Sequence, residues 1–563
     1  MQVKATGTAA YFSMDVAVEP NMPTYSGGLG VLSGDTLRSA ADLGVSMVGL
    51  TLLHRKGYFE QRLDNLGNQS ENPAVWSPGN FLESLPARVS VSIEGREVRV
   101  RAWQYPIRGV DGHTVPTLFL DTDLPENDPR DRELTDYLFG GDQHYRLCQE
   151  VVLGFGGVAM LHTLGFSNIS VYHMNEGHVA FVPLALLELR AEGELLDAVQ
   201  NGSVEEVRKQ CVFTTHTPVP YGHDQFPLDM VRQIVGTERT AALEKAGCCA
   251  GGNLNMTTLA LQFSRYANAV SMRHAEVCRE MFPGYRVSAI TNGVHATTWV
   301  SEPFSKLYDR YIPEWRRDNF YLRYAIQIPL GEIRAAHLKA KRELLNQVRL
   351  RTAVHLDERC MTLGFARRAT AYKRADLLFS DIDRLKSIAQ RMGGIQVIYA
   401  GKAHPRDEGG KLMIRRVFEA AAALRDQVRI VYLENYDMAL GQTICAGVDV
   451  WLNTPIRPQE ASGTSGMKAA LNGVPSLSVL DGWWIEGHVE QVTGWAIEDD
   501  GSNYASESDS LYSKLEHVIL PLFYQMPEEF ARVMRSSIAL NGAFFNTQRM
   551  VAQYVRNAYR FID

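Results

Sequence analysis

The chain has 563 residues, more than a single hydrophobic core usually serves, so we expect two domains. Its 45% hydrophobic and 21% charged residues are typical of a globular enzyme. The formal net charge of -7 argues against a dedicated nucleic-acid binder, which needs clustered lysine and arginine facing phosphates.

Short apolar or alternating runs recur between helical patterns along the whole chain and predict α/β layers with mostly parallel sheets. The expected strands of the first half are residues 9–14, 45–52, 98–105, 115–120, 169–173, 212–215 and 288–291. Those of the second half are residues 361–365, 395–400, 428–433, 448–452 and 475–480, with room for a crossover helix nearly every time.

The predicted domains are two doubly wound, Rossmann-like units of residues 1–293 and 294–563. We place the break near Gly293, where a strand-like run ends and a Pro-, Trp- and charge-rich stretch begins. The last segment, residues 546–563, opens with the N-cap types Asn546 and Thr547 and continues with apolar residues at helical spacing. Domains of this kind that face each other would bind their ligand in the cleft between them.

A glycine-rich loop, Ser26-Gly27-Gly28-Leu29-Gly30, follows the first predicted strand and precedes a helical pattern. Its amides would meet an anion at a helix N-terminus. Glycine-rich turns are common, however, and most of them bind nothing.

A basic run, from Arg367 to Arg374, follows the predicted strand 361–365 directly. Four charges in eight residues are most often a solvated helix face. Here they would stand just beyond the carboxyl end of a strand, where open α/β sheets bind ligands.

The most informative stretch is Glu460-Ala461-Ser462-Gly463-Thr464-Ser465-Gly466-Met467-Lys468, followed by Asn472-Gly473. Its glycines let the main chain approach a ligand closely, and successive amides in a tight turn form a concavity for a phosphate. Lysine is the residue type that forms an imine with pyridoxal phosphate. A lysine after a glycine-rich loop, taken alone, is usually a solvated surface charge.

This stretch closely resembles the pyridoxal-phosphate lysine segment of the α-glucan phosphorylases. Similar segments occur in the family's order from Tyr11-Phe12-Ser13-Met14 to Asn546-Thr547-Gln548-Arg549-Met550-Val551, which covers nearly the whole chain. The resemblance implies a GT-B-like fold and reversible phosphorolysis of terminal α-1,4-glucosidic bonds. It also implies pyridoxal 5'-phosphate as cofactor, with the cofactor's phosphate as general acid and base. The partners would be an α-1,4-glucan or maltooligosaccharide, inorganic phosphate and glucose 1-phosphate.

Matching the family motifs residue by residue implies roles on the phosphate side. Arg368 and Lys373 would hold the substrate phosphate, the first through a bidentate fork and the second as a point charge. Arg367 stands where many members have lysine near the cofactor phosphate, and Asp437 stands where many have a basic residue. The cofactor contacts that follow are Lys468, Thr464, Ser465, Arg367, Tyr436 and Gly28.

The same matching implies roles on the sugar side. His216, in Thr214-Thr215-His216-Thr217-Pro218, matches the histidine that meets the glucosyl unit, and His178 matches a histidine near the saccharide site. Each would more often be a structural residue if taken alone, and Asn292-Gly293 is by itself a common turn pair. The implied substrate-binding residues are Gly27, Gly28, His178, His216, Asn292, Glu460, Ser462 and Gly463, and the implied catalytic set is Lys468, Arg368, Lys373 and His216.

Two alternatives stay open: a sugar-nucleotide glucosyltransferase of the same architecture and a catalytically silent glucan-binding protein. A glycosidase needs a second carboxylate, and Glu460 has no obvious partner in the sequence.

Seven cysteines without a C-x-x-C spacing indicate neither a disulfide framework nor a zinc site, and His-Glu-x-x-His is absent, so we expect no metal. The start of the chain lacks the pattern of a signal peptide, and no run reaches 18 apolar residues. We therefore expect a cytoplasmic protein without a membrane or nucleic-acid partner. The sequence leaves open whether the chain forms a homo-oligomer.

Overall fold

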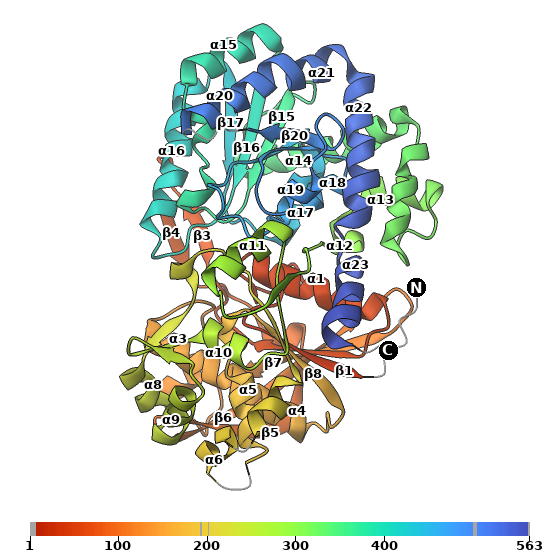
Figure 1. Cartoon of the computed structure of the whole chain (residues 1–563). Coiled ribbons are helices and arrows are strands. Elements are labelled where there is room, and N and C mark those ends of the chain that lie inside the picture. Colours follow the sequence, from red (N-terminus) through yellow and green to blue (C-terminus); the bar gives the residue numbers. More distant parts are fainter. Residues whose placement is uncertain (1–6, 192–193, 201, 499–503, 561–563) are drawn as a thin grey trace. The chain divides into compact units, whose positions relative to one another are not determined.

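A computed structural model describes residues 7–191, 194–200, 202–498 and 504–560. It divides the chain into two compact units (Figure 1). The first comprises the residues up to Phe59, Pro73–Ile290 and the residues from Met550 onward. The second comprises Glu60–Asn72 and Thr291–Arg549. We expected one break near residue 293, whereas the chain also passes between the units at residues 59/60, 72/73 and 549/550. The division into two domains that fold independently stays a prediction.

The first unit is built on a nine-stranded sheet of order β14-β13-β9-β8-β1-β2-β7-β6-β5. All neighbours from β14 to β7 are parallel, and β6 and β5 extend the sheet as antiparallel strands. The strands are β1 (Thr8–Ser13), β2 (Met47–Leu52), β5 (Glu83–Ile93), β6 (Arg96–Arg108), β7 (Thr114–Asp121), β8 (Ile169–Asn175), β9 (Cys211–Thr214), β13 (Tyr266–Ala269) and β14 (Val287–Ala289). A small separate sheet contains β10 (Gln225–Pro227), β11 (Cys249–Ala250) and β12 (Asn253–Asn255).

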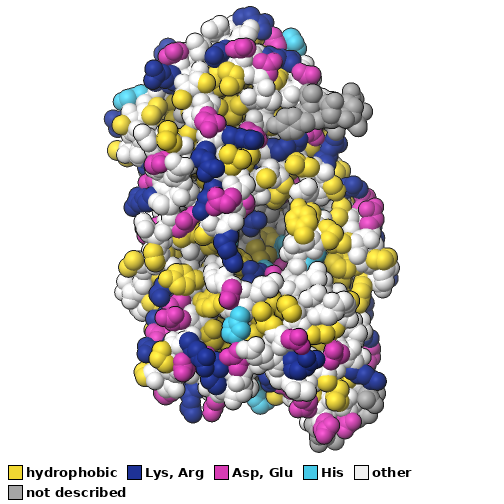
Figure 2. All heavy atoms as spheres, turned by 90° about the vertical axis from the view of Figure 1, so that its left-hand side faces the viewer, with side chains coloured by type: hydrophobic (Ala, Val, Ile, Leu, Met, Phe, Trp, Pro, Cys, Tyr) yellow, Lys and Arg dark blue, Asp and Glu magenta, His cyan; other side chains and the backbone are white. Residues whose placement is uncertain are grey.

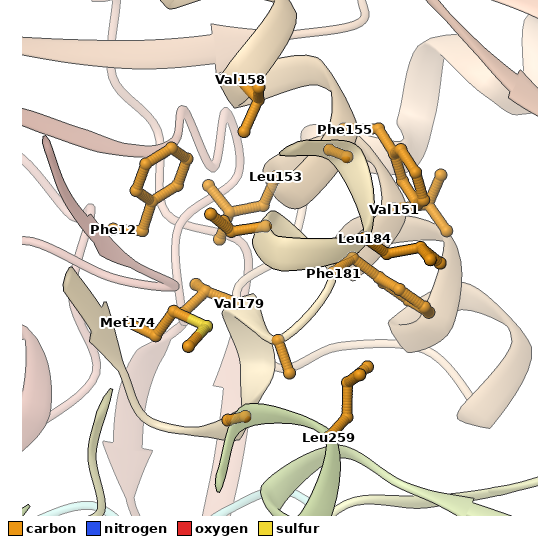
Figure 3. Packing of buried hydrophobic residues seen from close by; sticks show 14 of the residues in the cluster. Phe12, Val151, Leu153, Phe155, Val158, Met174, Val179, Phe181, Leu184 and Leu259 are labelled. Carbon is orange, nitrogen blue, oxygen red and sulfur yellow. The ribbon is translucent and has the colours of Figure 1, made fainter. Parts of the chain in front are cut away.

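Helices cover both faces of this sheet. Successive side chains of a strand point to opposite faces, so each face of the sheet has its own core. Ala10 and Phe12 of β1 pack into one core, and Ala9 and Tyr11 pack into another. Figure 3 shows the first core around Phe12. The helices are α1 (Gly28–Asp42), α2 (Pro129–Arg132), α3 (Gln143–Val151), α4 (Gly157–Thr163), α5 (Val182–Glu188), α6 (Leu195–Gln200), α7 (Ser203–Arg208), α8 (Leu228–Val235), α9 (Thr237–Lys245), α10 (Met256–Gln262) and α11 (Met272–Met281).

The end of the chain completes the second of these cores. Asn546 caps α23 (Thr547–Gln553), since its side-chain oxygen accepts a hydrogen bond from Arg549 N at 2.9 Å. Past α23, Tyr554 and Tyr559 bond to the sheet: the Tyr559 hydroxyl lies 2.7 Å from His173 Nδ1 of β8. The closing segment is therefore part of the first unit's hydrophobic core from Met550 onward.

The second unit contains a six-stranded, wholly parallel sheet of order β17-β16-β15-β18-β19-β20. In sequence order this is 3-2-1-4-5-6, the strand order of a doubly wound nucleotide-binding sheet. The fold is therefore α/β, as predicted. The strands are β15 (Met361–Ala366), β16 (Ile395–Ala400), β17 (Val428–Leu433), β18 (Val450–Asn453), β19 (Ser476–Val479) and β20 (Gly494–Ile497). A hairpin of β3 (Glu60–Leu63) and β4 (Gln69–Asn72) also belongs to this unit.

Helices surround the second sheet (Figure 1). The longest is α14 (Leu330–Thr352), which buries apolar residues from Ile333 to Val348. The others are α12 (Ala296–Trp299), α13 (Glu302–Tyr311), α15 (Ile382–Met392), α16 (Glu408–Leu424), α17 (Met438–Gly447), α18 (Ser465–Ala470), α19 (Trp484–Gly487), α20 (Tyr504–Lys514), α21 (Leu520–Gln525) and α22 (Pro527–Ser536).

Several predicted strand boundaries differ from the observed ones by one or more residues, and the end of β14 is one of them. We expected a strand at residues 288–291, but β14 ends at Ala289. Beyond it, Val294 N donates to Phe545 O at 3.1 Å and Thr547 N donates to Val294 O at 3.0 Å. The residues after β14 thus leave the sheet of the first unit to pair with a distant segment of the second.

Two surface properties bear on partners. On the face shown in Figure 2, described basic and acidic side chains are interspersed, so neither sign dominates that face. Within the described parts of the chain, each helix is too short or too polar to span a membrane.

Candidate functional site

The predicted site residues of the second unit gather where its strand order reverses. In an open α/β sheet, ligands bind outside the carboxyl ends of the strands at this point. Arg367 and Arg368 follow β15, Glu460 and Ser462 lie in the connection after β18, and Lys468 lies in α18 at the end of that connection.

Arg367 is a buried cation whose donors are incompletely used. Its Nη2 donates to Leu452 O at 2.7 Å, while its buried Nε has no hydrogen-bond partner among the described residues. Burial lowers the pKa of this guanidinium, and its carbon lies 4.5 Å from the ring centre of Phe365. A buried donor without a partner is costly, so this position suits an anion.

Lys373 and Glu460 contact each other. The ammonium of Lys373 donates to the carboxylate of Glu460, and both side chains are buried. The lysine predicted to hold phosphate and the carboxylate predicted to bind sugar therefore meet. Arg368, by contrast, is exposed and has no ion-pair partner within the described chain.

A small pocket adjoins Arg367 and Lys373. Arg367 and Lys373 line it on the polar side, and Phe365, Tyr399 and Tyr432 are among its largely apolar walls. Because such walls exclude water, an anion here would interact with the cations more strongly than at an exposed surface.

Lys468 is buried beneath the ring of Trp299, the residue at which the Pro-, Trp- and charge-rich stretch begins. Its Nζ lies 3.8 Å from the ring centre of Trp299, and only 7% of Lys468 is exposed. Asn472 joins the two elements, since its Nδ2 donates to Trp299 O at 2.8 Å and to Lys468 O at 3.0 Å. This explains the asparagine of the motif, and Trp299 is a functional candidate that the sequence reasoning missed.

The sugar-side residues of the second unit lie in a tight turn. Asp481, also missed, accepts from Glu460 N and from Gly482 N, both at 2.9 Å. Gly463 has a φ of 85°, which favours glycine. Ser462 Oγ is buried and has no hydrogen-bond partner among the described residues, as expected of a group awaiting a polar ligand.

Asn292 is held in a constrained loop rather than in a free turn. Arg549 donates to Thr291 O at 2.6 Å and to Asn292 O at 2.9 Å. A Cβ at Gly293 would lie 2.2 Å from the backbone carbon of Asn546, so only glycine fits. The side-chain oxygen of Asn292 is buried and unpartnered within the described residues.

The remaining predicted cofactor contacts of this unit are Tyr436, Ser465 and Thr464. Tyr436 follows β17, and a Cβ at Gly441 would come within 2.9 Å of its hydroxyl. Ser465 Oγ accepts from Trp451 Nε1 at 3.1 Å, so this hydroxyl already has a partner. Thr464 O accepts from Lys468 N at 3.2 Å.

In the first unit the glycine loop begins α1, as predicted. Apart from the adjoining backbone, no atom of the described residues lies within 4 Å of where a Cβ would stand at Gly27 or Gly28. At Gly34 that position is 1.9 Å from Ala17 O, and at Gly30 it is 2.5 Å from Asp15 Oδ2. The first two glycines leave space for a ligand, whereas the later two permit close packing.

Asp15 lies under this loop and gives a pH-dependent prediction. Burial raises the pKa of its carboxyl from 3.8 to about 7. Between these values the unfolded chain loses the proton that the folded chain keeps, so the contribution of Asp15 to stability falls as pH rises. The Asp15→Asn variant has no titrating carboxyl at this position. Its free energy of unfolding minus that of the parent should therefore increase from about pH 4 to about pH 7. Urea unfolding of both proteins across that pH range measures this difference. Parallel curves of unfolding free energy against pH would contradict the raised pKa of Asp15.

His216 is fixed by two neighbours. Glu176 accepts from His216 N at 2.7 Å and from Thr217 Oγ1 at 3.0 Å, and Glu176 itself has a φ of 77°, a conformation that costs energy outside glycine. His216 Nε2 lies 2.7 Å from Asn175 Oδ1. Burial lowers the pKa of His216 to about 4, so the ring is neutral at pH 7 and donates through Nε2.

His178 lies in a second polar cluster. Its Nε2 is 3.4 Å from Asp224, which also pairs with Arg146 at 2.7 Å. Burial, followed by the charge of Arg146, lowers the pKa of His178 to about 4. His178 Nδ1 has no hydrogen-bond partner among the described residues. The ligand roles of His178 and His216 stay predictions. The predicted cleft, which would bring these histidines to the site residues of the second unit, also stays a prediction.

The chain is similar to proteins of known name. A family model described as Carbohydrate phosphorylase matches residues 236–496. A maltodextrin phosphorylase of Thermococcus litoralis is 39% identical over 98% of this chain and 70% of its own length. Glycogen phosphorylases of Mycobacterium tuberculosis and Aquifex aeolicus are 35% and 34% identical, over 99% and 98% of this chain and 71% and 85% of their own lengths.

Proposed function

Because the chain belongs to the carbohydrate phosphorylase family, we propose that it is an α-glucan phosphorylase acting on maltodextrin or glycogen. It transfers the terminal α-1,4-linked glucosyl unit to inorganic phosphate, releases α-D-glucose 1-phosphate and also runs in reverse. The observation that carries the proposal is the meeting of Lys373 with Glu460 beside the buried donor of Arg367. One wall of the site offers cations to a phosphate, and the adjoining turn offers polar groups to a sugar.

Pyridoxal 5'-phosphate fits the second unit. The buried amine of Lys468 would be the point of covalent attachment, and Arg367 would offer a donor to the cofactor phosphate. Tyr436, Thr464 and Ser465 would complete its surroundings, and Gly28 of the first unit is the predicted contact from that side. When bound, the cofactor supplies a phosphate with a second pKa of about 6, which suits general acid–base chemistry near pH 7.

The protein's own groups bind and orient the reactants. Arg368 is exposed and unpaired in the described chain, so its guanidinium is available to the substrate phosphate, and Lys373 adds a second cation. Charge-assisted bonds of this kind are stronger than neutral ones and need no reorganisation during the reaction.

The glucosyl unit would be oriented by groups whose polar atoms await partners. Asn292 Oδ1 and Ser462 Oγ each have no partner in the described chain. Glu460 offers a carboxylate, and a Cβ at Gly463 would stand 3.1 Å from Glu460 Cδ, so glycine lets the two residues lie close together. His216 is neutral at pH 7 and would bind the sugar without adding charge. Gly27, Gly28 and His178 are the further predicted contacts from the first unit.

The test is a coupled assay in both directions. Maltooligosaccharide and inorganic phosphate should yield glucose 1-phosphate, and glucose 1-phosphate should lengthen the oligosaccharide. Glu460→Gln should slow both directions by roughly tenfold or more, because a charged hydrogen bond is worth about 1.5–3 kcal/mol. Cofactor absorbance should persist in this variant. Extension of glucan only from a sugar nucleotide would identify a glucosyltransferase instead, and binding without turnover would identify a silent glucan-binding protein.

A further inference from the structure

The hairpin of β3 and β4 belongs to the second unit although its sequence lies in the first half of the chain. The chain enters the second unit at Glu60 and returns to the first at Pro73. The two strands pair antiparallel, with Gln61 opposite Glu71 and Leu63 opposite Gln69. Nothing in the sequence marks these thirteen residues as part of the second sheet's surroundings.

Gln61 joins the hairpin to the loops that follow β16 and β17. Its Nε2 donates to Gly401 O at 2.8 Å, and its Oε1 accepts from Asn435 N at 2.9 Å. Asn435 Oδ1 in turn accepts from Gln61 N at 3.2 Å. Gln61 is fully buried, so these bonds are sheltered from competing water.

Gln69 makes a second, similar connection. Its Nε2 donates to Ala403 O at 2.9 Å, and its Oε1 accepts from Ala403 N at 3.0 Å. Gln61 Nε2 also donates to Gln69 Oε1 at 2.8 Å, so the two amides form one network. The loop from Gly401 to Ala403 is thereby held at both ends by the hairpin.

This loop supports the segment that carries the predicted phosphate-binding arginines. Arg367 N donates to Ala400 O at 3.1 Å, and Ala369 N donates to Lys402 O at 3.0 Å. A Cβ at Gly401 would stand 1.9 Å from Arg367 O, which shows how closely the two backbones approach. A displacement of the loop would therefore move Arg367 and its neighbour Arg368.

The other loop carries Tyr436. Asn435, which precedes it, has a φ of 55°, a left-handed conformation that is uncommon outside glycine. The reciprocal bonds with Gln61 hold Asn435 in that conformation. One buried glutamine thus fixes both the loop that packs against the backbone of Arg367 and the loop that carries Tyr436.

We propose that the hairpin holds the anion pocket of the second unit in its binding geometry and that Gln61 is a positioning residue for the cofactor and substrate phosphates. The identity of the anion rests on the proposed function, whereas the positioning role does not. Segment 60–72 of the first half of the chain would then be needed to complete a pocket formed by the second half.

The experiment compares Gln61→Ala with Arg62→Ala in the full chain. Arg62 is on the same hairpin, but its ion pair with Glu434 is 60% and 38% exposed and contributes little. Gln61→Ala should weaken pyridoxal 5'-phosphate affinity and raise the KM for phosphate on the order of tenfold, since several buried hydrogen bonds are lost. It should also speed hydrogen exchange in residues 367–369, 401–403 and 434–436. Arg62→Ala should do neither.

Gln69→Ala is the second variant if Gln61→Ala does not fold, and the same changes are expected from it. A purely structural role would lower the Tm while leaving cofactor affinity and phosphate KM within about twofold of the parent, and this result overturns the proposal. Unchanged exchange in the three segments also overturns it. If the parent binds neither pyridoxal 5'-phosphate nor inorganic phosphate, the proposed function fails, and the exchange comparison still decides the positioning role.

Discussion

Lys468→Ala is expected to release the cofactor and to reduce phosphorolysis to the background of the assay. The buried amine beneath Trp299 is the predicted point of covalent attachment, and alanine cannot form that bond. In the parent, borohydride reduction followed by peptide mapping should find the pyridoxyl label on Lys468. The variant should lack both the label and the cofactor absorbance.

Two comparisons make this result specific. Lys386→Ala removes a lysine of α15 whose nearest carboxylate, Asp383, is 3.9 Å away, and it should keep label and activity. Trp299→Leu removes the ring that covers the amine, so it should weaken cofactor retention while leaving Lys468 as the labelled residue. A label on another lysine of the parent, at full cofactor loading, would reject the assignment.

The second sheet was the more predictable part of the fold. Its strands β16 and β17 match the predicted ranges residue for residue. β16 is buried along its whole length and is an almost continuous apolar run, whereas β17, at the edge of the sheet, alternates buried residues with more exposed ones.

Strands without such runs were missed. β13 has the sequence Tyr-Ala-Asn-Ala and β20 has Gly-Trp-Ala-Ile, and neither is rich in β-branched residues. Both take their places through pairing with neighbouring strands, for example Ala267 with Phe213 and Leu477 with Trp495. Pairing with neighbouring strands makes these segments β-strands, and the local sequence pattern carries no information about that pairing.

The residues of the candidate site divide in the same way, into those within a local motif and those brought together by the fold. Motifs identified Lys468, Arg367 and Glu460, because glycines and charges at fixed spacing have chemical reasons to stand together. Trp299 and Arg549 were missed, since their contacts with Lys468 and Asn292 join positions more than 150 residues apart. The hairpin was missed for the same reason, as Gln61 and Asn435 are 374 residues apart.

The last prediction concerns Arg368 and Lys373, the two cations that would bind the substrate phosphate. Arg368→Ala and Lys373→Ala should each lower the rate with phosphate or glucose 1-phosphate roughly a hundredfold, since a lost charged contact to a developing charge costs on the order of 3 kcal/mol. The structure separates the two variants in stability. Arg368 is exposed and its loss should leave Tm unchanged, whereas Lys373→Ala leaves the buried carboxylate of Glu460 without its partner and should lower Tm.

Combining Lys373→Ala with Glu460→Gln tests that reasoning, because removing the carboxylate charge should restore part of the lost Tm without restoring activity. Cofactor content, measured by absorbance, should stay near that of the parent in Arg368→Ala. Arg384→Ala, which removes a cation of α15 paired with Asp509, is the matched control and should leave kinetics unchanged. If Arg368→Ala and Lys373→Ala both keep the parent's kinetics, then these cations do not bind the substrate phosphate, and a different part of the second unit does.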